Sequence, residues 1–131
     1  HYVELCDILE RESKKSGELL IENGAHTKEV FFILHGRVQI ELIPTIGQAP
    51  RDICVLHAGE SVGELQLAKD VARTTNARAK GNVTYLKCHK DKLAQFLEVN
   101  PRAGLLFYHN LSACLADRLQ QTNLLALNLL R

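Results

Sequence analysis

The spacing of apolar residues changes twice along this chain. Near the amino terminus apolar positions recur at helical spacing, which predicts a short amphipathic helix from Tyr2 to about Ser13. Short apolar runs follow, and each is bounded by residues typical of turns. Such runs are typical of the strands of an antiparallel barrel or sandwich. The predicted strands are 19–21, 30–34, 38–42, 53–56 and 82–88.

Turn residues separate these predicted strands. The sequence predicts turns at Asn23-Gly24 and at His35-Gly36, because glycine tolerates the positive φ that tight turns need. The longer stretch from Pro44 to Pro50 predicts a mobile hairpin loop.

Helical spacing returns after the last predicted strand. Apolar residues within 90–97 predict one helix, and Asn100-Pro101 ends it. A longer helix is predicted from about Arg102 to the end of the chain. We expect one domain that spans the chain and has three segments. These segments are an amino-terminal helix in 1–16, a β-barrel in 17–89 and helices in 90–131.

Composition limits the kinds of protein that this chain could be. Its 131 residues, 46% of them apolar, are enough for one domain with a core. A net charge of +1, with both signs interspersed, predicts no binding of nucleic acid through this chain alone. No run of about 18 apolar residues occurs, so no membrane span is predicted. Because the sequence begins at His1 and has no Met, we expect a fragment of a longer protein.

Cysteine and histidine spacing argues against a metal centre. The four cysteines form no C-x-x-C pair, and the six histidines form no H-x-H or H-E-x-x-H motif. A cupin-like metal enzyme is therefore disfavoured. We expect buried, reduced thiols in a cytosolic protein rather than disulfides. The cysteines are Cys6, Cys54, Cys88 and Cys114.

The segment from Gly63 to Ala79 carries the most chemistry in the chain. Glu64 directly follows a glycine, and Arg73 comes nine residues later, before Thr74 and Thr75. An arginine is a planar donor fork suited to phosphate, and a glutamate accepts hydrogen bonds from paired sugar hydroxyls. A glycine lets backbone N–H groups approach an anion closely. The segment thus predicts a site for a small sugar phosphate.

These residues also have purely structural interpretations. Arg73 could pair with a surface carboxylate such as Asp70, and Glu64 could cap a short helix at 65–68. Thr75 could simply be a polar strand residue. The residue types alone leave both interpretations open.

The order of the motif resembles that of a known family. GEL-x-L followed by R-T-T-x-x-x-A is similar to the phosphate-binding cassette of the cyclic nucleotide-binding domain family. The upstream runs G-E-L-L-I-x-x-G and V-F-F-I-L-x-G-x-V-x-I resemble the first strands of that family, so the resemblance covers about 17–122. It implies a mainly β fold with flanking helices (α+β), in which a long carboxy-terminal helix follows an eight-stranded jelly-roll barrel. The chain departs from the family at Val62, Gln66 and Ala72, where the family has an aromatic, a small residue and a proline.

The resemblance implies a role for each polar residue of the cassette, which spans 62–79. Residues implied at the phosphate are Arg73, Thr74, Thr75 and Leu65, the last through its backbone N–H. Those implied at the ribose are Glu64 and Gly63. Thr74 leaves the choice of base open, because a threonine there also occurs in domains that accept cyclic GMP. We expect cyclic AMP rather than cyclic GMP.

The long helix is expected to close over the base. On the resemblance, Thr122 and Asn123 fall where the family contacts adenine, with Val62 nearby, although two polar residues on a solvated helix face would look the same. The helix also has a heptad-like seam that predicts a homodimer, unless this stripe packs on its own barrel. The seam positions are Tyr108, Ser112, Leu115, Leu119, Thr122, Ala126 and Leu129.

Together these features predict a regulatory sensor and not an enzyme. It would bind a cyclic 3′,5′-nucleotide without any other cofactor and act through its last helix on an attached or partner domain. It would work in the cytoplasm, or on the cytoplasmic side of a membrane protein. The alternative is a degenerate domain that kept the fold for structure or dimerisation and binds no ligand.

Overall fold

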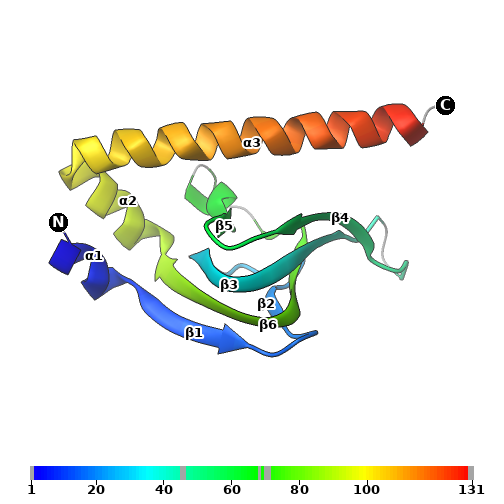
Figure 1. Cartoon of the computed structure of the whole chain (residues 1–131), viewed down its shortest axis with the longest axis horizontal. Helices are drawn as coiled ribbons and strands as arrows, with labels where there is room; N and C mark the ends of the chain where they lie inside the picture. The colour runs from blue at the N-terminus through cyan, green and yellow to red at the C-terminus, as the bar shows by residue number, and fades with distance from the viewer. Residues whose placement is uncertain (1, 45–46, 68, 70–71, 130–131) are drawn as a thin grey trace. The chain divides into compact units, whose positions relative to one another are not determined.

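A computed structural model gives the fold of the chain and describes residues 2–44, 47–67, 69 and 72–129. The chain divides into two compact units, 1–94 and 95–131. The first unit contains the β-structure and the second is helical (Figure 1). The predicted mobility of the loop from Pro44 to Pro50 cannot be compared with the structure, because 45–46 lie outside the described residues.

An antiparallel sheet forms the first unit. Strand β6 pairs with β1, β2 and β3, and β3 also pairs with β4 and β5 (Figure 1). The portion of the chain that the structure describes has six strands, against the eight that the resemblance implied. These strands are β1 (Glu10–Lys14), β2 (Leu19–Ile21), β3 (Glu29–Leu42), β4 (Arg51–Leu56), β5 (Ser61–Val62) and β6 (Asn76–His89).

The helices begin and end near the predicted positions, with one exception. Helix α2 (Lys90–Val99) ends before the predicted break, and α3 (Pro101–Leu129) begins at the proline. Because Pro lacks an N–H, it is well placed at the start of a helix. The short 3₁₀ helix η1 (Glu64–Leu67) follows β5. The exception is the first helix, α1 (Tyr2–Ile8), which is shorter than predicted.

The prediction of a helix to Ser13, within an amino-terminal helical segment spanning 1–16, is wrong. Strand β1 takes over at Glu10 and pairs with β6. Its Glu12 lies opposite Tyr85 and accepts a hydrogen bond from that hydroxyl at 3.1 Å, and its other carboxylate oxygen lies 2.7 Å from Lys87 Nζ. These cross-strand pairs favour the strand over the local helical pattern.

The prediction of a turn at His35-Gly36 is also wrong. Strand β3 continues through this point as one strand, although its register against β6 shifts on both sides of His35. Gly36 has φ of +91°, and a Cβ there would collide with the carbonyl oxygen of Asn82 on β6. The glycine therefore allows an irregular, closely packed strand pair rather than a chain reversal.

The core of the first unit is apolar and lies along β3 and β6. The rings of Phe31 and Tyr85 meet edge to face with centroids 5.4 Å apart, and Tyr85 is only 1% exposed. This geometry is favourable for aromatic pairs. The buried core residues are Ile21, Phe31, Ile33, Val38, Leu56, Val62, Ala77, Ala79, Val83 and Tyr85.

None of the four cysteines forms a disulfide, and they lie in different environments. Cys88 is buried in β6, and burial raises the pKa of its thiol to about 11. Cys54 and Cys114 are half-buried, while Cys6 is exposed. The prediction of burial therefore holds fully only for Cys88.

The second unit turns between α2 and α3. The side-chain amide of Asn100 donates to the carbonyl of Phe96 at 3.0 Å and closes the end of α2. Gly104 then lies so near the backbone of Leu97 that a Cβ would come within 2.6 Å of its carbonyl oxygen. A glycine in the first turns of α3 thus allows the two helices to meet closely.

Candidate functional site

The candidate site is built where the end of β5 meets the segment before β6. Gly63 follows β5 with φ of +81°, and a Cβ on it would lie 2.7 Å from Nη1 of Arg73. A side chain at this position would push the arginine away. Glycine is therefore required both by the backbone conformation and by the neighbouring guanidinium.

Arg73 is buried and held by three protein oxygens. It is 6% exposed, and its Nε donates to the hydroxyl of Thr27 at 3.1 Å. Its Nη1 donates to the carbonyl of Gly63 at 3.1 Å, and its Nη2 donates to the carbonyl of Glu29 at 2.5 Å. A buried cation needs such partners, since burial without them is costly. The guanidinium thus joins the loop before β3 to the end of β5.

The electrostatics of Arg73 also bring Glu64 into the site. Burial lowers the pKa of Arg73 from its ordinary value, and the negative charges of Glu29 and Glu64 oppose that change. Because an arginine starts from a very high pKa, it stays charged at neutral pH. The site therefore contains a buried cation with two carboxylates close enough to stabilise it.

The backbone of Arg73 is fixed by the turn between β2 and β3. Its N–H donates to the carbonyl of Ala25 at 2.8 Å, and its carbonyl accepts from the N–H of Gly24 at 2.7 Å. The predicted turn at Asn23-Gly24 is present, with φ of +85° at the glycine. One turn thus holds the main chain at Arg73.

The structure brings some of the predicted site residues together. Gly63, Glu64 and Arg73 form one buried or half-buried cluster. Thr74 is exposed and Thr75 is half-buried on the segment that leads into β6. The side chain of Leu65 lies outside the described residues, as do Ala68 and Asp70, so the proposed pair of Asp70 with Arg73 stays untested.

The residues predicted for the base are placed differently. Val62 is buried in the core of the first unit. Thr122 and Asn123 belong to the second unit, where both are exposed on α3. The Thr122 hydroxyl donates to the carbonyl of Arg118 on the same helix at 2.9 Å.

Sequence reasoning placed Gly63 in the site but missed its carbonyl contact and the other two groups that hold Arg73. Glu29 and Gly63 contribute carbonyl oxygens, which every residue has, so no residue pattern could point to them. Thr27 contributes its side-chain hydroxyl. In the sequence, the only feature that could have pointed to this contact is a hydroxyl residue between a predicted turn and a predicted strand.

The cassette lies in a region of the sequence that one family shares. Residues 11–100, more than half of the chain, match the profile of the cyclic nucleotide-binding domain. The chain belongs to the cyclic nucleotide-binding domain family. This confirms the resemblance that the cassette suggested. The family consists of regulatory, ligand-binding domains.

Solved structures share the fold of this cyclic nucleotide-binding domain. The Thermus thermophilus Catabolite Activator Protein is 25% identical with a TM-score of 0.77, and the match covers 98% of this chain and 57% of that one. The c-di-GMP responsive global regulator CLP of Xanthomonas campestris is 18% identical with a TM-score of 0.82, over 93% and 59% of the two chains. The regulatory domain of Toxoplasma gondii PKA, solved with cAMP, is 19% identical with a TM-score of 0.67, over 77% and 41%.

These comparisons confirm the predicted fold class, a mainly β jelly-roll followed by a long carboxy-terminal helix. The domain spans less than two thirds of each of the three solved chains. No curated protein sequence matches it significantly.

Within the described residues, no helix is long and apolar enough to cross a membrane. No group of three or more His, Cys, Asp or Glu side chains in that portion of the chain is placed to hold a metal ion.

Proposed function

We propose that this domain is a non-enzymatic sensor that binds a cyclic 3′,5′-nucleotide, with cyclic AMP preferred to cyclic GMP. The observation that carries the proposal is the buried Arg73 cation beside Gly63 and Glu64, in the order of the family's phosphate-binding cassette. A cyclic nucleotide carries one negative charge on its phosphodiester, and a charge-assisted hydrogen bond to that group is worth about 1.5–3 kcal/mol.

The guanidinium retains donors for a phosphate. Arginine has five N–H donors, and the protein acceptors around Arg73 engage three of them. A bound anion would accept from the two N–H donors that these contacts leave. The backbone N–H of Leu65 and the hydroxyls of Thr74 and Thr75 would add donors at the phosphate.

The sugar and the base would be held by other groups. Glu64 would accept hydrogen bonds from the ribose, and Gly63 would let the sugar approach the backbone closely. Thr122 and Asn123 on α3 would contact the base, with Val62 packing nearby. Closure of α3 over the ligand would pass the change to an attached or partner domain, as a ligand shifts the populations of two states.

The relatives support a nucleotide but do not fix which one. The Toxoplasma PKA domain was solved with cAMP, whereas the Xanthomonas regulator responds to c-di-GMP. The preference for cyclic AMP therefore needs a direct competition between ligands.

Calorimetric titration of the chain with cyclic AMP and cyclic GMP tests this proposal. We expect saturable binding of cyclic AMP, and a rise in thermal stability that at about 100 times the dissociation constant corresponds to about 2.7 kcal/mol. Arg73→Lys keeps the charge but loses the fork, so it should weaken binding more than tenfold. Arg11→Lys, at an exposed position of β1, is the matched control and should leave affinity unchanged.

Two results would count against a sensor. The first is the absence of heat or stabilisation with either nucleotide at millimolar concentration. The second is an affinity that Arg73→Lys leaves unchanged. Because Arg73 also holds the fold together, each variant must first show a cooperative unfolding transition at the temperature of the titration.

A structural module without ligand is the second candidate function. It is supported by the three hydrogen bonds that Arg73 makes to protein oxygens, because these give the arginine a role without any nucleotide. On this alternative Arg73→Ala lowers stability, and nucleotides change nothing. The titration above therefore distinguishes the two candidates.

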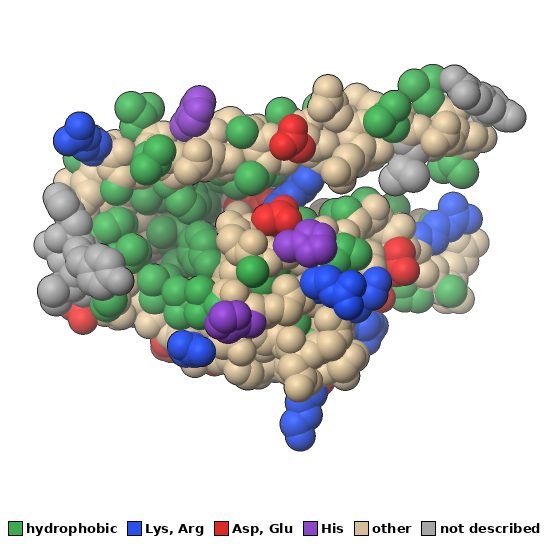
Figure 2. Space-filling model, viewed as in Figure 1, with side chains coloured by type: hydrophobic (Ala, Val, Ile, Leu, Met, Phe, Trp, Pro, Cys, Tyr) green, Lys and Arg blue, Asp and Glu red, His purple; other side chains and the backbone are tan. Residues whose placement is uncertain are grey.

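We also propose that α3 forms a homodimer through its heptad-like seam. Leu119 is 61% exposed in the single chain, and the seam residues Tyr108, Leu115 and Leu129 are exposed as well. Figure 2 shows apolar side chains recurring along this helix. Such a row of leucines is stabilised when a second helix covers it.

A cytoplasmic location, or one on the cytoplasmic side of a membrane protein, completes the proposal. It is supported by four cysteines that form no disulfide, because thiols persist in reducing compartments. The output domain would belong to a longer parent protein or to a partner.

A further inference from the structure

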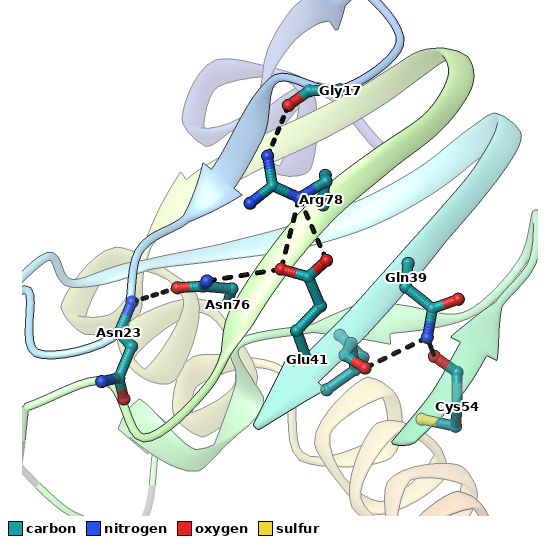
Figure 3. A network of polar contacts seen from close by, with 8 residues as sticks. Gly17, Asn23, Gln39, Glu41, Cys54, Asn76 and Arg78 are labelled. Carbon is teal, nitrogen blue, oxygen red and sulfur yellow. Dashed lines mark hydrogen bonds and ion pairs between the residues drawn. The ribbon is translucent and has the colours of Figure 1, made fainter. Parts of the chain in front are cut away.

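A chain of polar contacts crosses β3 and β6 and ends at Asn23 (Figure 3). Arg78 donates from Nη1 to the carbonyl of Gly17 at 2.8 Å, and from Nε to both carboxylate oxygens of Glu41 at 3.2 and 3.1 Å. Asn76 donates to Glu41 at 3.3 Å and accepts from the backbone N–H of Asn23 at 2.7 Å. We call Glu41, Asn76 and Arg78 the Glu41 network.

The Glu41 network is largely shielded from water. Glu41 is 8% exposed and Asn76 is 5% exposed, whereas the side chain of Arg78 is partly exposed. A buried carboxylate is tolerated when charged and polar donors surround it, and here two side chains donate to it. A satisfied buried network of this kind holds its members in one arrangement.

The end of this network reaches the backbone of the phosphate-binding cassette through Asn23. With its amide turned so that Nδ2 faces acceptors, Asn23 donates to the carbonyl of Thr74 at 2.9 Å and to that of Arg73 at 3.3 Å. The neighbouring N–H of Gly24 donates to the carbonyl of Arg73 at 2.7 Å. Asn23 is therefore held by Asn76 on one side and holds two cassette peptides on the other.

We propose that Asn23 is a positioning residue for the ligand phosphate. It fixes the peptides at Arg73 and Thr74, and so fixes where the guanidinium lies, while the Glu41 network fixes Asn23. Asn23 acts through Arg73 and Thr74 and does not touch the ligand. The inference rests on the nucleotide binding proposed above and adds a residue outside the cassette that sets its affinity. Small displacements of a charged group weaken a directional hydrogen bond strongly.

Asn23→Asp tests this proposal, because it keeps the shape of the side chain but replaces the amide donor with an acceptor. A carboxylate facing two carbonyl oxygens is repelled, so the cassette backbone should move. We expect cyclic AMP affinity to fall about tenfold, the size typical of one lost and one unfavourable polar contact. Asn82→Asp, at an exposed position of β6, is the matched control and should bind like the unchanged chain.

A second measurement needs no ligand. The Nε–H signal of Arg73 in a ¹⁵N spectrum, assigned by its loss in Arg73→Lys, reports the contact of that group with Thr27. We expect this signal to shift in Asn23→Asp and to stay in place in Asn82→Asp. A general loss of stability would instead broaden or move the signals of many groups.

The combined results separate the two proposals. A shifted Nε–H signal with weakened affinity supports the positioning role. An unmoved signal, or a moved signal with unchanged affinity, overturns it. If the unchanged chain binds no nucleotide, the proposed function fails instead, and the Nε–H signal alone decides whether Asn23 orients Arg73. Urea unfolding of both variants at neutral pH confirms that each is folded.

Discussion

At the scale of single residues, the best-defined charged cluster joins β1 to β6. Glu12 contacts both the ammonium of Lys87 and the hydroxyl of Tyr85. The hydrogen bond from Lys87 is the main cause that lowers the pKa of Glu12, and the same contact raises the pKa of Lys87. Each partner thus keeps the other in its charged form.

The lowered pKa of Glu12 predicts a loss of stability in acid. A carboxyl whose folded pKa is below its unfolded value stabilises the fold above the unfolded pKa, and this contribution disappears as pH falls through the folded pKa. Glu12→Gln should therefore lower stability at neutral pH by at most about 1 kcal/mol, since the pair is partly exposed. In urea unfolding, the difference from the unchanged chain should shrink as the pH falls below about 4.3, the ordinary pKa of a glutamate. Glu22→Gln on an exposed turn should show no such pattern.

The raised pKa of Tyr85 predicts a loss of stability at high pH. Burial, and then the hydrogen bond to Glu12, raises the pKa of Tyr85 to about 12. The unfolded chain loses this proton first, so stability should fall as pH rises from about 10 towards the folded pKa. Tyr85→Phe should reduce this fall, and Tyr108→Phe should not, when unfolding is measured between about pH 9 and 11. An equal fall in all three proteins would assign the effect to other groups such as Lys87.

The same scale shows why the site was only partly predictable. Arg73, Glu64 and Gly63 could be found because their side chains, or the lack of one, carry the chemistry of the cassette. The carbonyl oxygens that hold Arg73 could not be predicted, because every residue has a backbone carbonyl and no residue type marks the ones that face the arginine. Asn23 was predicted as a turn residue, but its amide contacts depend on a peptide about 50 residues later.

At the scale of elements, the sequence predicted those strands and helix ends that depend on neighbouring residues in the chain. The strand at 19–21 and the helix break at Asn100-Pro101 are present as expected. The strand at 10–14 was missed because its stability comes from pairing with β6, far away in the sequence. Partners on another strand leave no periodic signal within a short window.

The irregular region of β3 gives a prediction at this scale. Gly36 and Gly81 both have positive φ, but a Cβ at Gly81 would meet open space, whereas one at Gly36 would collide with the backbone of Asn82. Gly81→Ala should cost about 1–2 kcal/mol for the backbone alone. Gly36→Ala should cost at least about 2 kcal/mol more, because β3 and β6 must separate. Urea unfolding of the two variants measures this difference, and equal losses would contradict the packing role of Gly36.

At the scale of the whole molecule, the last helix predicts association. Light scattering after size-exclusion chromatography should give the mass of a dimer, and Leu119→Lys should reduce it to a monomer. Leu106→Lys is the control, because Leu106 is equally exposed but lies off the seam. A monomer at every concentration up to about 100 µM would contradict the dimer, since obligate coiled-coil contacts persist at such concentrations.

The position of Arg73 has one more consequence. A single cation in the segment before β6 contacts the residue after β5, 10 positions away in the sequence, and the start of β3, 44 positions away. If a bound phosphate moved this guanidinium, its hydrogen bonds to both segments would change together. Ligand binding would then change the stability of the sheet as well as the position of the last helix. Hydrogen exchange at the backbone amides of β3, measured with and without ligand, would detect the change in the sheet.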